Sequence, residues 1–204
     1  MRERIGLRPD DVLLLSVGRL EANKGFDVLI RALSMLVENK TLPAGWRWVL
    51  VGDGPLRTVL AREIAEHHLE ERAILTGRAG DDDLQGWYEA ADLFVHPTLY
   101  EGSSLVTLEA MAHRRAIVAT RAGGLPDKVE PGVNGWLVPP GDARALADAV
   151  REALSDRPAL IKMGVMSRAI VEREFSWTVV LDRFMAIFEE LLSRRSAAAP
   201  IIGD

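Results

Sequence analysis

Short apolar strands alternate with amphipathic helices along most of this chain, and this alternation constrains the fold more than any other feature. The run VLLLSV at 12–17 is almost wholly apolar, and similar runs follow at 46–51, 91–96 and 116–120. Between the first two runs, residues 26–37 carry apolar side chains at helical spacing. Strands that are apolar on both faces and separated by helices are typical of parallel sheets with helices on both faces. The sequence therefore predicts a single α/β domain.

Composition excludes several classes of protein. The net charge of −5 argues against a general nucleic-acid-binding protein, so no nucleic-acid partner is expected. The chain has no cysteine, which excludes disulfides, thiolate zinc sites and cysteine nucleophiles. No apolar run approaches the roughly 20 residues that span a bilayer, and no secretory signal opens the chain. A cytoplasmic location is expected.

The stretch EGSSLVTLEA at 101–110 follows a predicted strand and opens a predicted helix. Ser103 or Ser104 is a suitable N-cap for that helix. The free N–H groups of its first turn, with the positive end of the helix dipole, favour a phosphate. Glu101 precedes this anion site and Glu109 follows it, so the two carboxylates could hold hydroxyl groups on both sides of a diphosphate. The alternative is that both are solvated surface carboxylates.

A second candidate anion site follows the first predicted strand, in the sequence GRLEANKG at 18–25. Arg19 and Lys24 flank a four-residue loop there, and together they could neutralise a diphosphate. Ligands of parallel sheets bind outside the carboxyl ends of the strands, where this loop is expected. Other glycine-rich turns predicted at the same edge lie at 52–54, 77, 102 and 123–124. The alternative is that Arg19 pairs with a surface acid and Lys24 has no ligand.

Five segments of the chain together resemble a known family. They are GRLEANKG at 18–25, LVGDGP at 50–55, LTGR at 75–78, YEGSSLVTLEAMA at 100–112 and AGGLPDKVEPGVNGWLVPPGD at 122–142. In this order and spacing they resemble the C-terminal, nucleotide-sugar-binding half of a retaining glycosyltransferase of family 4, which has the GT-B fold. The resemblance covers about residues 12 to 190 and implies a Rossmann-like domain.

The resemblance implies a role for each matching position. Arg19 and Lys24 match the basic pair that holds the donor diphosphate, and Glu101 matches a glutamate near the donor sugar; these three are the implied catalytic residues. Glu109 matches the glutamate that binds the ribose hydroxyls. The remaining implied nucleotide-binding positions are Gly18, Gly52, Thr76, Gly77, Arg78, Ser104, Leu105 and Val106. Of these, the turn at 76–78 is implied to face the base, and the backbone at 105–106 the β-phosphate.

The implied reaction moves a sugar from a nucleotide-diphospho-sugar, such as a UDP-sugar, to an acceptor hydroxyl with retention at the anomeric carbon. It needs no metal or other cofactor, and the four histidines show no metal-ligand spacing. Among these histidines, His96 is expected to make a structural hydrogen bond. His67 and His68 are expected to lie at a solvated helix end.

Nothing in the sequence matches the N-terminal half that carries the acceptor site in GT-B enzymes. Residues 1–11 are therefore expected to be an interdomain run-in, 12–192 the nucleotide-sugar-binding domain and 193–204 a disordered tail. Such a chain is expected to bind nucleotide without catalysing transfer, and the full-length enzyme could lie at the membrane periphery. A non-catalytic nucleotide-sugar-binding module is the alternative. A dinucleotide oxidoreductase is disfavoured, because 18–25 lacks the G-x-G-x-x-G pattern.

The chain departs from the family pattern at two places. Ser103-Ser104 replaces a bulkier aromatic-glycine pair, so the family pattern does not indicate which sugar is preferred. Arg114 and Ala116 stand where a glycine and a proline are usual.

The predicted helix at 177–194 carries a broad apolar stripe, whose partner in GT-B enzymes is commonly the first domain. This helix is expected to self-associate or to be poorly ordered; the alternative is that it folds onto its own domain.

Overall fold

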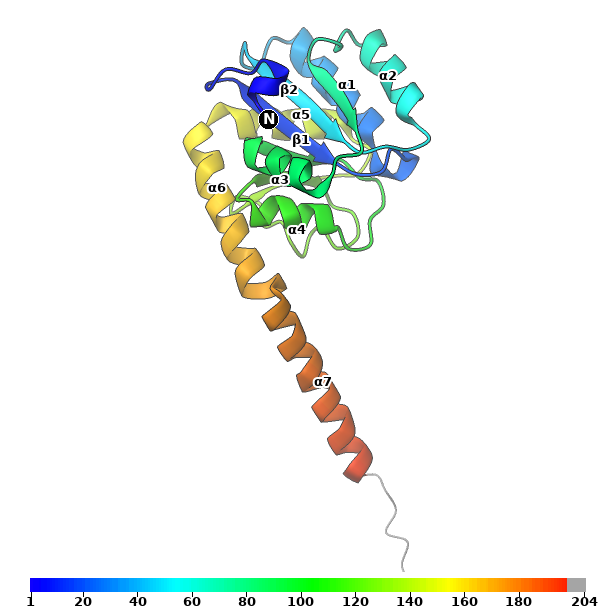
Figure 1. Ribbon diagram of the computed structural model, residues 1–204, viewed down its shortest axis with the longest axis vertical. Coiled ribbons are helices and arrows are strands. Elements are labelled where there is room, and N and C mark those ends of the chain that lie inside the picture. The colour runs from blue at the N-terminus through cyan, green and yellow to red at the C-terminus, as the bar shows by residue number, and fades with distance from the viewer. Residues whose placement is uncertain (198–204) are drawn as a thin grey trace, which may run out of the picture.

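The computed structural model describes residues 1–197, which form a six-stranded, fully parallel sheet with helices on both faces (Figure 1). The strands lie in the order β3-β2-β1-β4-β5-β6. Their bounds are β1 Val12–Val17, β2 Trp46–Val51, β3 Ala73–Gly77, β4 Leu93–His96, β5 Ala116–Thr120 and β6 Gly135–Val138. The predicted single α/β domain is confirmed.

Residues 1–197 contain seven α-helices, of which α1 to α6 pack around the sheet. They are α1 Phe26–Glu38, α2 Arg57–Glu66, α3 Asp81–Ala90, α4 Leu105–Ala112, α5 Ala143–Ser155, α6 Arg157–Ile170 and α7 Trp177–Ala197. Two 3-10 turns, at Glu3–Ile5 and Ala22–Lys24, and a π-helical turn at Val171–Phe175 complete the elements of the described part of the chain.

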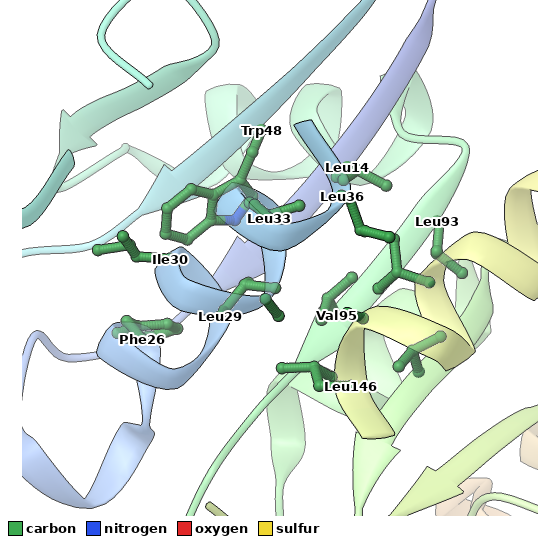
Figure 2. Close-up of a cluster of buried hydrophobic side chains, with 14 of the residues drawn as sticks. Leu14, Phe26, Leu29, Ile30, Leu33, Leu36, Trp48, Leu93, Val95 and Leu146 are labelled. Atoms are coloured by element: carbon green, nitrogen blue, oxygen red, sulfur yellow. The ribbon is translucent and has the colours of Figure 1, made fainter. Parts of the chain in front are cut away.

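Alternation along each strand gives the sheet two separate cores. Leu14 of β1 packs with α1, α2 and α5 on one face, whereas Leu13 and Leu15 pack with α3 and α4 on the other. Figure 2 shows the first core, in which Trp48 and Val95 lie among the apolar side chains of α1. The side chains of α1 in this core recur three and four residues apart, as the period of a helix requires; they include Phe26, Leu29, Ile30, Leu33 and Leu36.

The sequence also predicts a helix that reaches about His68, a strand at 73–75 and a helix at 158–173, and their observed boundaries differ. The predicted helix ending near His68 stops at Glu66, because His68 takes a left-handed backbone with φ 54° and the amide of Leu69 donates to the Ile64 carbonyl, closing the turn. The predicted helix at 158–173 ends as an α-helix at Ile170 and continues as the π-helical turn. The strand predicted at 73–75 extends to Gly77.

The chain order reverses between β1 and β4, which are neighbours in the sheet. The loops that follow these two strands are joined by hydrogen bonds. The carbonyl oxygen of Asn23 accepts from the Leu99 amide at 2.8 Å and from the Thr98 hydroxyl at 2.8 Å. Gly25 takes a left-handed φ of 64°, and a β-carbon there would lie 2.2 Å from the Pro97 carbonyl oxygen. The two loops are therefore held against each other at the carboxyl edge of the sheet.

The N-terminal segment predicted as a run-in packs at the opposite edge. Arg2 forms an ion pair with Asp92 at 2.9 Å, and Asp92 also accepts from the Leu13 amide at 2.7 Å. Arg157 of α6 pairs with the second oxygen of the same carboxylate at 3.1 Å. The carboxylate of Asp92 thus joins the start of the chain, β1 and α6.

Helix α7 runs away from the sheet domain (Figure 1), and its apolar side chains are largely exposed. Phe184 and Phe188 are 55% and 56% exposed, and Trp177 is 81% exposed. Within the described residues the helix does not fold back onto its own domain. Residues 193–197 of the predicted tail continue α7, and 198–204 lie outside the described residues. No helix among residues 1–197 is both long enough and apolar enough to cross a membrane.

We expect the purified chain to self-associate through α7, because an exposed apolar stripe of this length is unfavourable in water. Light scattering over a concentration series should show a mass above that of the monomer, and protease mapping should show protection of 175–197. The double variant Phe184→Glu, Phe188→Glu should stay monomeric, whereas Val59→Glu on α2 should behave as the parent chain. A strictly monomeric chain whose α7 is protected from protease would contradict this prediction.

Candidate active site

A partly buried ion pair lies where the loops after β1 and β4 meet. The ammonium of Lys24 lies 2.7 Å from Oε2 of Glu101, and the two side chains are only 18% and 13% exposed. Lys24 closes the 3-10 turn after β1, and Glu101 follows β4 in the neighbouring loop. The two residues are 77 positions apart in the sequence, so only the adjacency of β1 and β4 brings them together.

The carboxylate of Glu101 has three hydrogen-bond donors. Besides Lys24, His96 donates from Nε2 to Oε2 at 3.2 Å, and the Gly102 amide donates to Oε1 at 3.1 Å. The hydrogen bond from His96, followed by that from Lys24 and the charge of Lys24, lowers the pKa of Glu101 to about 2. Glu101 is therefore a fixed anion at neutral pH.

His96 supports Glu101 from the interior of the domain. Its side chain is 2% exposed, and burial lowers its pKa, so the ring is neutral at neutral pH. Its single proton belongs on Nε2, which faces Glu101. Nδ1 is buried and has no partner among the described residues, and this tautomer leaves it as a lone pair rather than an unpaired N–H. The expected structural hydrogen bond of His96 is thus made to Glu101.

Helix α4 begins beside this pair and presents its N-terminus at the same edge. Ser104 is the N-cap, and its hydroxyl oxygen accepts from the Thr107 amide at 3.3 Å. Of the two predicted caps, Ser104 is therefore the one used, and Ser103 precedes the helix. The amides of Leu105 and Val106 fall in the first turn, where a helix leaves its N–H groups without carbonyl partners in the helix. Such a terminus suits an anion.

Glu109 lies on the same helix and bonds to a neighbouring helix. The hydroxyl of Tyr88, on α3, donates to Oε2 of Glu109 at 2.7 Å. Burial, together with this hydrogen bond, raises the pKa of Tyr88, so the phenol stays protonated and remains a donor. One oxygen of Glu109 is held by this bond.

A hollow of about 640 Å³ opens beside these groups, at the carboxyl ends of β1, β2 and β3. Its lining includes four predicted site residues, Gly18, Arg19, Gly52 and Arg78. The other lining residues are Val17, Val51, Asp53, Gly54, Ala79 and Leu84. The structure thus brings together residues from three separate sequence segments, and it forms a cavity of a size suited to a small organic ligand.

Glycines allow the loops that line the hollow to pack closely against each other. Gly52 has φ 145°, and a β-carbon there would lie 1.8 Å from the Gly18 carbonyl oxygen, so a side chain is excluded. A β-carbon at Gly18 would meet the Lys24 side chain at 4.0 Å. Gly18 therefore lines the hollow and also lies near the side chain of Lys24.

Not all predicted site residues meet at one point. The guanidinium of Arg19 is 76% exposed and pairs with Glu21 at 2.6 Å, which is the alternative considered for it. Thr76 donates its hydroxyl to the neighbouring Gly77 carbonyl at 2.9 Å, at the end of β3. Lys24, Glu101, Glu109 and the 104–106 turn of α4 lie outside the lining of the hollow.

Two residues of this region have no signal in the sequence analysis. Tyr88 lies in a predicted helix without any mark of its contact with Glu109, which is 21 residues away. Lys128 is 4% exposed and donates to Ser103 at 3.3 Å. Its neighbours Leu125 and Val129 are buried as well. His67 and His68, both predicted at a solvated helix end, differ in exposure. His67 is half-buried and forms a hydrogen bond with Ser34 at 3.1 Å, whereas His68 is exposed.

Residues 1–197 contain no group of three or more histidine, aspartate and glutamate side chains arranged to hold a metal ion. The groups present at the edge are a partly buried lysine, an ionised carboxylate, a helix N-terminus and a second carboxylate on α4. Together these groups can bind an anion and hydroxyl groups near it.

Because the pKa of Glu101 is low, the free energy of unfolding of the chain should depend on pH in the acid range. The pKa of Glu101 in the folded chain, about 2, lies below the ordinary 4.5, so its contribution is present above about pH 4.5 and is lost as pH falls towards 2. The difference in free energy of unfolding between the parent chain and Glu101→Gln should shrink by on the order of 2 kcal/mol over that range. Urea unfolding at several pH values measures this difference.

The exposed Glu70 is the matched control for that experiment. The difference between the parent chain and Glu70→Gln should stay near zero throughout. A difference for Glu101→Gln that does not depend on pH would show that Glu101 is not held as a stabilised anion.

Comparison with known proteins identifies the family. Residues 11–156 match the family described as Glycosyl transferases group 1. Alpha-D-kanosaminyltransferase of Streptomyces kanamyceticus is 31% identical over 191 residues, covering 94% of this chain and 48% of that protein. The chain spans about half the length of the curated relatives it matches.

Solved structures agree with this match. Anabaena Alr3699/HepE in complex with UDP-glucose has a TM-score of 0.81 at 26% identity, covering 93% of this chain and 51% of that one. The C-terminal domain of the glycosyl transferase group 1 family protein LpcC from Francisella tularensis has a TM-score of 0.73 at 26% identity, covering 81% of this chain and 87% of that one. The fold matches that of GT-B glycosyltransferase structures, and the chain belongs to the group 1 glycosyltransferase family.

Proposed function

We propose that this chain is the donor-binding, C-terminal half of a retaining, family 4 glycosyltransferase, and that it binds a nucleotide-diphospho-sugar. The observation that carries the proposal is the Lys24–Glu101 pair beside the N-terminus of α4, at the point where the strand order reverses. Ligands of open parallel sheets bind at such a point. A solved relative that holds UDP-glucose and another that is a C-terminal domain of similar extent support the proposal.

The diphosphate is the centre of the proposed site. The amides of Leu105 and Val106 at the start of α4 receive one phosphate, and the ammonium of Lys24 lies beside the same helix start through its bond to Glu101. Arg19 joins them by exchanging its exposed partner Glu21 for the ligand. These positive groups stabilise the negative charge that builds on the departing diphosphate as the bond to the sugar breaks.

The remaining groups hold the two ends of the donor. Glu101, fixed as an anion, accepts hydrogen bonds from hydroxyls of the sugar, and Glu109 accepts from the ribose hydroxyls. The hollow receives the nucleoside: the backbone of Gly18 and Gly52 allows close approach, and the 76–78 segment, with Thr76, Gly77 and Arg78, borders the base. The Ser104 cap occupies the Thr107 amide and leaves the amides of Leu105 and Val106 for the ligand.

The acceptor site, in this proposal, belongs to an N-terminal domain that this chain does not contain. Transfer with retention at the anomeric carbon then needs both halves and no metal ion, and the complete enzyme acts in the cytoplasm or at the membrane periphery. The alternative is a module with the same geometry that binds nucleotide-sugar without any catalytic partner. An upstream reading frame encoding a second Rossmann-like domain would distinguish the enzyme from the module.

Binding without transfer is the direct test of the proposed function. In calorimetric titration the chain should bind at least one of UDP, GDP and ADP, and the matching nucleoside should bind at least about tenfold more weakly, because it lacks the charged hydrogen bonds of the diphosphate. With the matching nucleotide-glucose and a panel of acceptor sugars, no nucleoside diphosphate should be released above the buffer blank. Binding of none of the three, or sustained release, would contradict the proposal.

The two glutamates should separate in their effects. Glu109→Gln should weaken both the nucleoside diphosphate and the nucleotide-sugar by about 1–3 kcal/mol, since a ribose contact is common to both ligands. Glu101→Gln should weaken the nucleotide-sugar without weakening the nucleoside diphosphate, because it removes the carboxylate that competes with the diphosphate for Lys24. Glu70→Gln should alter neither. If both site variants weaken the bare diphosphate alike, the assignment of Glu101 to the sugar is wrong.

A further inference from the structure

Lys128 is a buried lysine that the proposed function does not use. It lies in the loop between β5 and β6 and is 4% exposed. Burial lowers the pKa of its ammonium, which records the cost of removing a charge from water. A lysine in such a position needs partners that offset this cost.

The partners of the Lys128 ammonium are neutral groups. Nζ donates to the Ser103 hydroxyl at 3.3 Å and to the Gly124 carbonyl at 3.1 Å, and it lies 5.6 Å from the centre of the Phe175 ring. No carboxylate of the described residues lies within ion-pair distance of it. The charges of Asp127 and Glu101 attract the ammonium from beyond that distance, whereas Lys24 forms a direct ion pair with Glu101.

The backbone of Lys128 is fixed in place. Its amide donates to the Leu125 carbonyl at 3.0 Å, and its carbonyl accepts from the buried side chain of Asn134 at 3.0 Å. The ammonium is thus held from a rigid base, and it can in turn hold what it contacts.

Its two hydrogen-bond partners belong to two loops that meet beside Glu101. The Gly124 amide donates to the Gly102 carbonyl at 3.0 Å. Gly123 has a left-handed φ of 51°, and a β-carbon there would lie 1.5 Å from the Glu101 carbonyl oxygen, so the loops are in direct contact. Lys128 joins the same two loops a second time through its side chain, immediately before the N-cap of α4.

We propose that Lys128 is a positioning residue for the donor sugar: by binding Ser103 and Gly124 it fixes the turn at 102–104 between Glu101 and the start of α4. This inference rests on the proposed function, in which Glu101 faces the sugar and α4 the diphosphate. The turn lies between those two groups in the sequence, so its conformation sets where the sugar lies relative to the phosphates. The nucleoside end of the donor does not depend on it.

The test compares Lys128→Met, which keeps the length and removes the ammonium, with Lys128→Arg and Ser103→Ala. Each is titrated with the tightest-binding member of UDP, GDP and ADP and with its glucose-bearing form. Lys128→Met should weaken the nucleotide-glucose about tenfold, the loss of a charged hydrogen bond, and leave the nucleoside diphosphate unchanged. Lys128→Arg should restore part of the loss, because it returns the charge.

Ser103→Ala makes the experiment independent of how well Lys128→Met folds. It should reproduce the selective loss, and adding it to Lys128→Met should cause little further loss, because both changes break the same contact. Equal weakening of both ligands in parallel with a fall in melting temperature would show a purely structural role and overturn the inference, as would unchanged nucleotide-glucose affinity. If the parent chain binds none of the ligands, the proposed function itself is overturned.

Discussion

The pairing of β1 with β4 is the constraint on which the rest of this site depends. The two strands are separated by most of the first half of the chain, yet they are parallel neighbours at the centre of the sheet. Their carboxyl ends therefore lie side by side, and Asn23 and Gly25 of the first loop fit closely against 97–99 of the second. This fit places the ammonium of Lys24 on the carboxylate of Glu101.

The charges of Glu101 and Lys24 determine which ligand groups can bind at this edge of the sheet. Glu101 is satisfied by three donors and remains an anion, so it can accept from hydroxyl groups but cannot act as an acid at neutral pH. The charge of Lys24 is neutralised by Glu101 in the free chain, so in the proposed complex the diphosphate competes with Glu101 for it. Breaking a partly buried charge pair is costly, so the ligand has to supply new contacts to both partners. In the proposal the phosphate does so for Lys24 and the sugar hydroxyls do so for Glu101.

The sheet, and the helices that cover it, could be predicted from local sequence, whereas the contacts within the site could not. The apolar runs at 12–17, 46–51, 91–96 and 116–120 predict four of the six strands, and a serine before an apolar helix predicts the cap, because both signals lie within a few residues. The bond from Tyr88 to Glu109 and that from Lys128 to Ser103 join distant segments, and no local pattern encodes them. Arg19 follows β1 as predicted, but its position in the sequence does not determine where its exposed side chain points. In the structure its guanidinium pairs with Glu21.

The most direct test of the central claim is the affinity of the chain for a nucleoside diphosphate when Lys24 is replaced. Lys24→Ala removes a charged hydrogen bond to the diphosphate, so calorimetric titration should show binding weaker by about 1.5–3 kcal/mol than in the parent chain. Lys162→Ala, at an exposed lysine of α6, should leave the affinity unchanged. Equal affinities for the parent chain and a folded Lys24→Ala variant would contradict the placement of the diphosphate at the junction of the β1 and β4 loops.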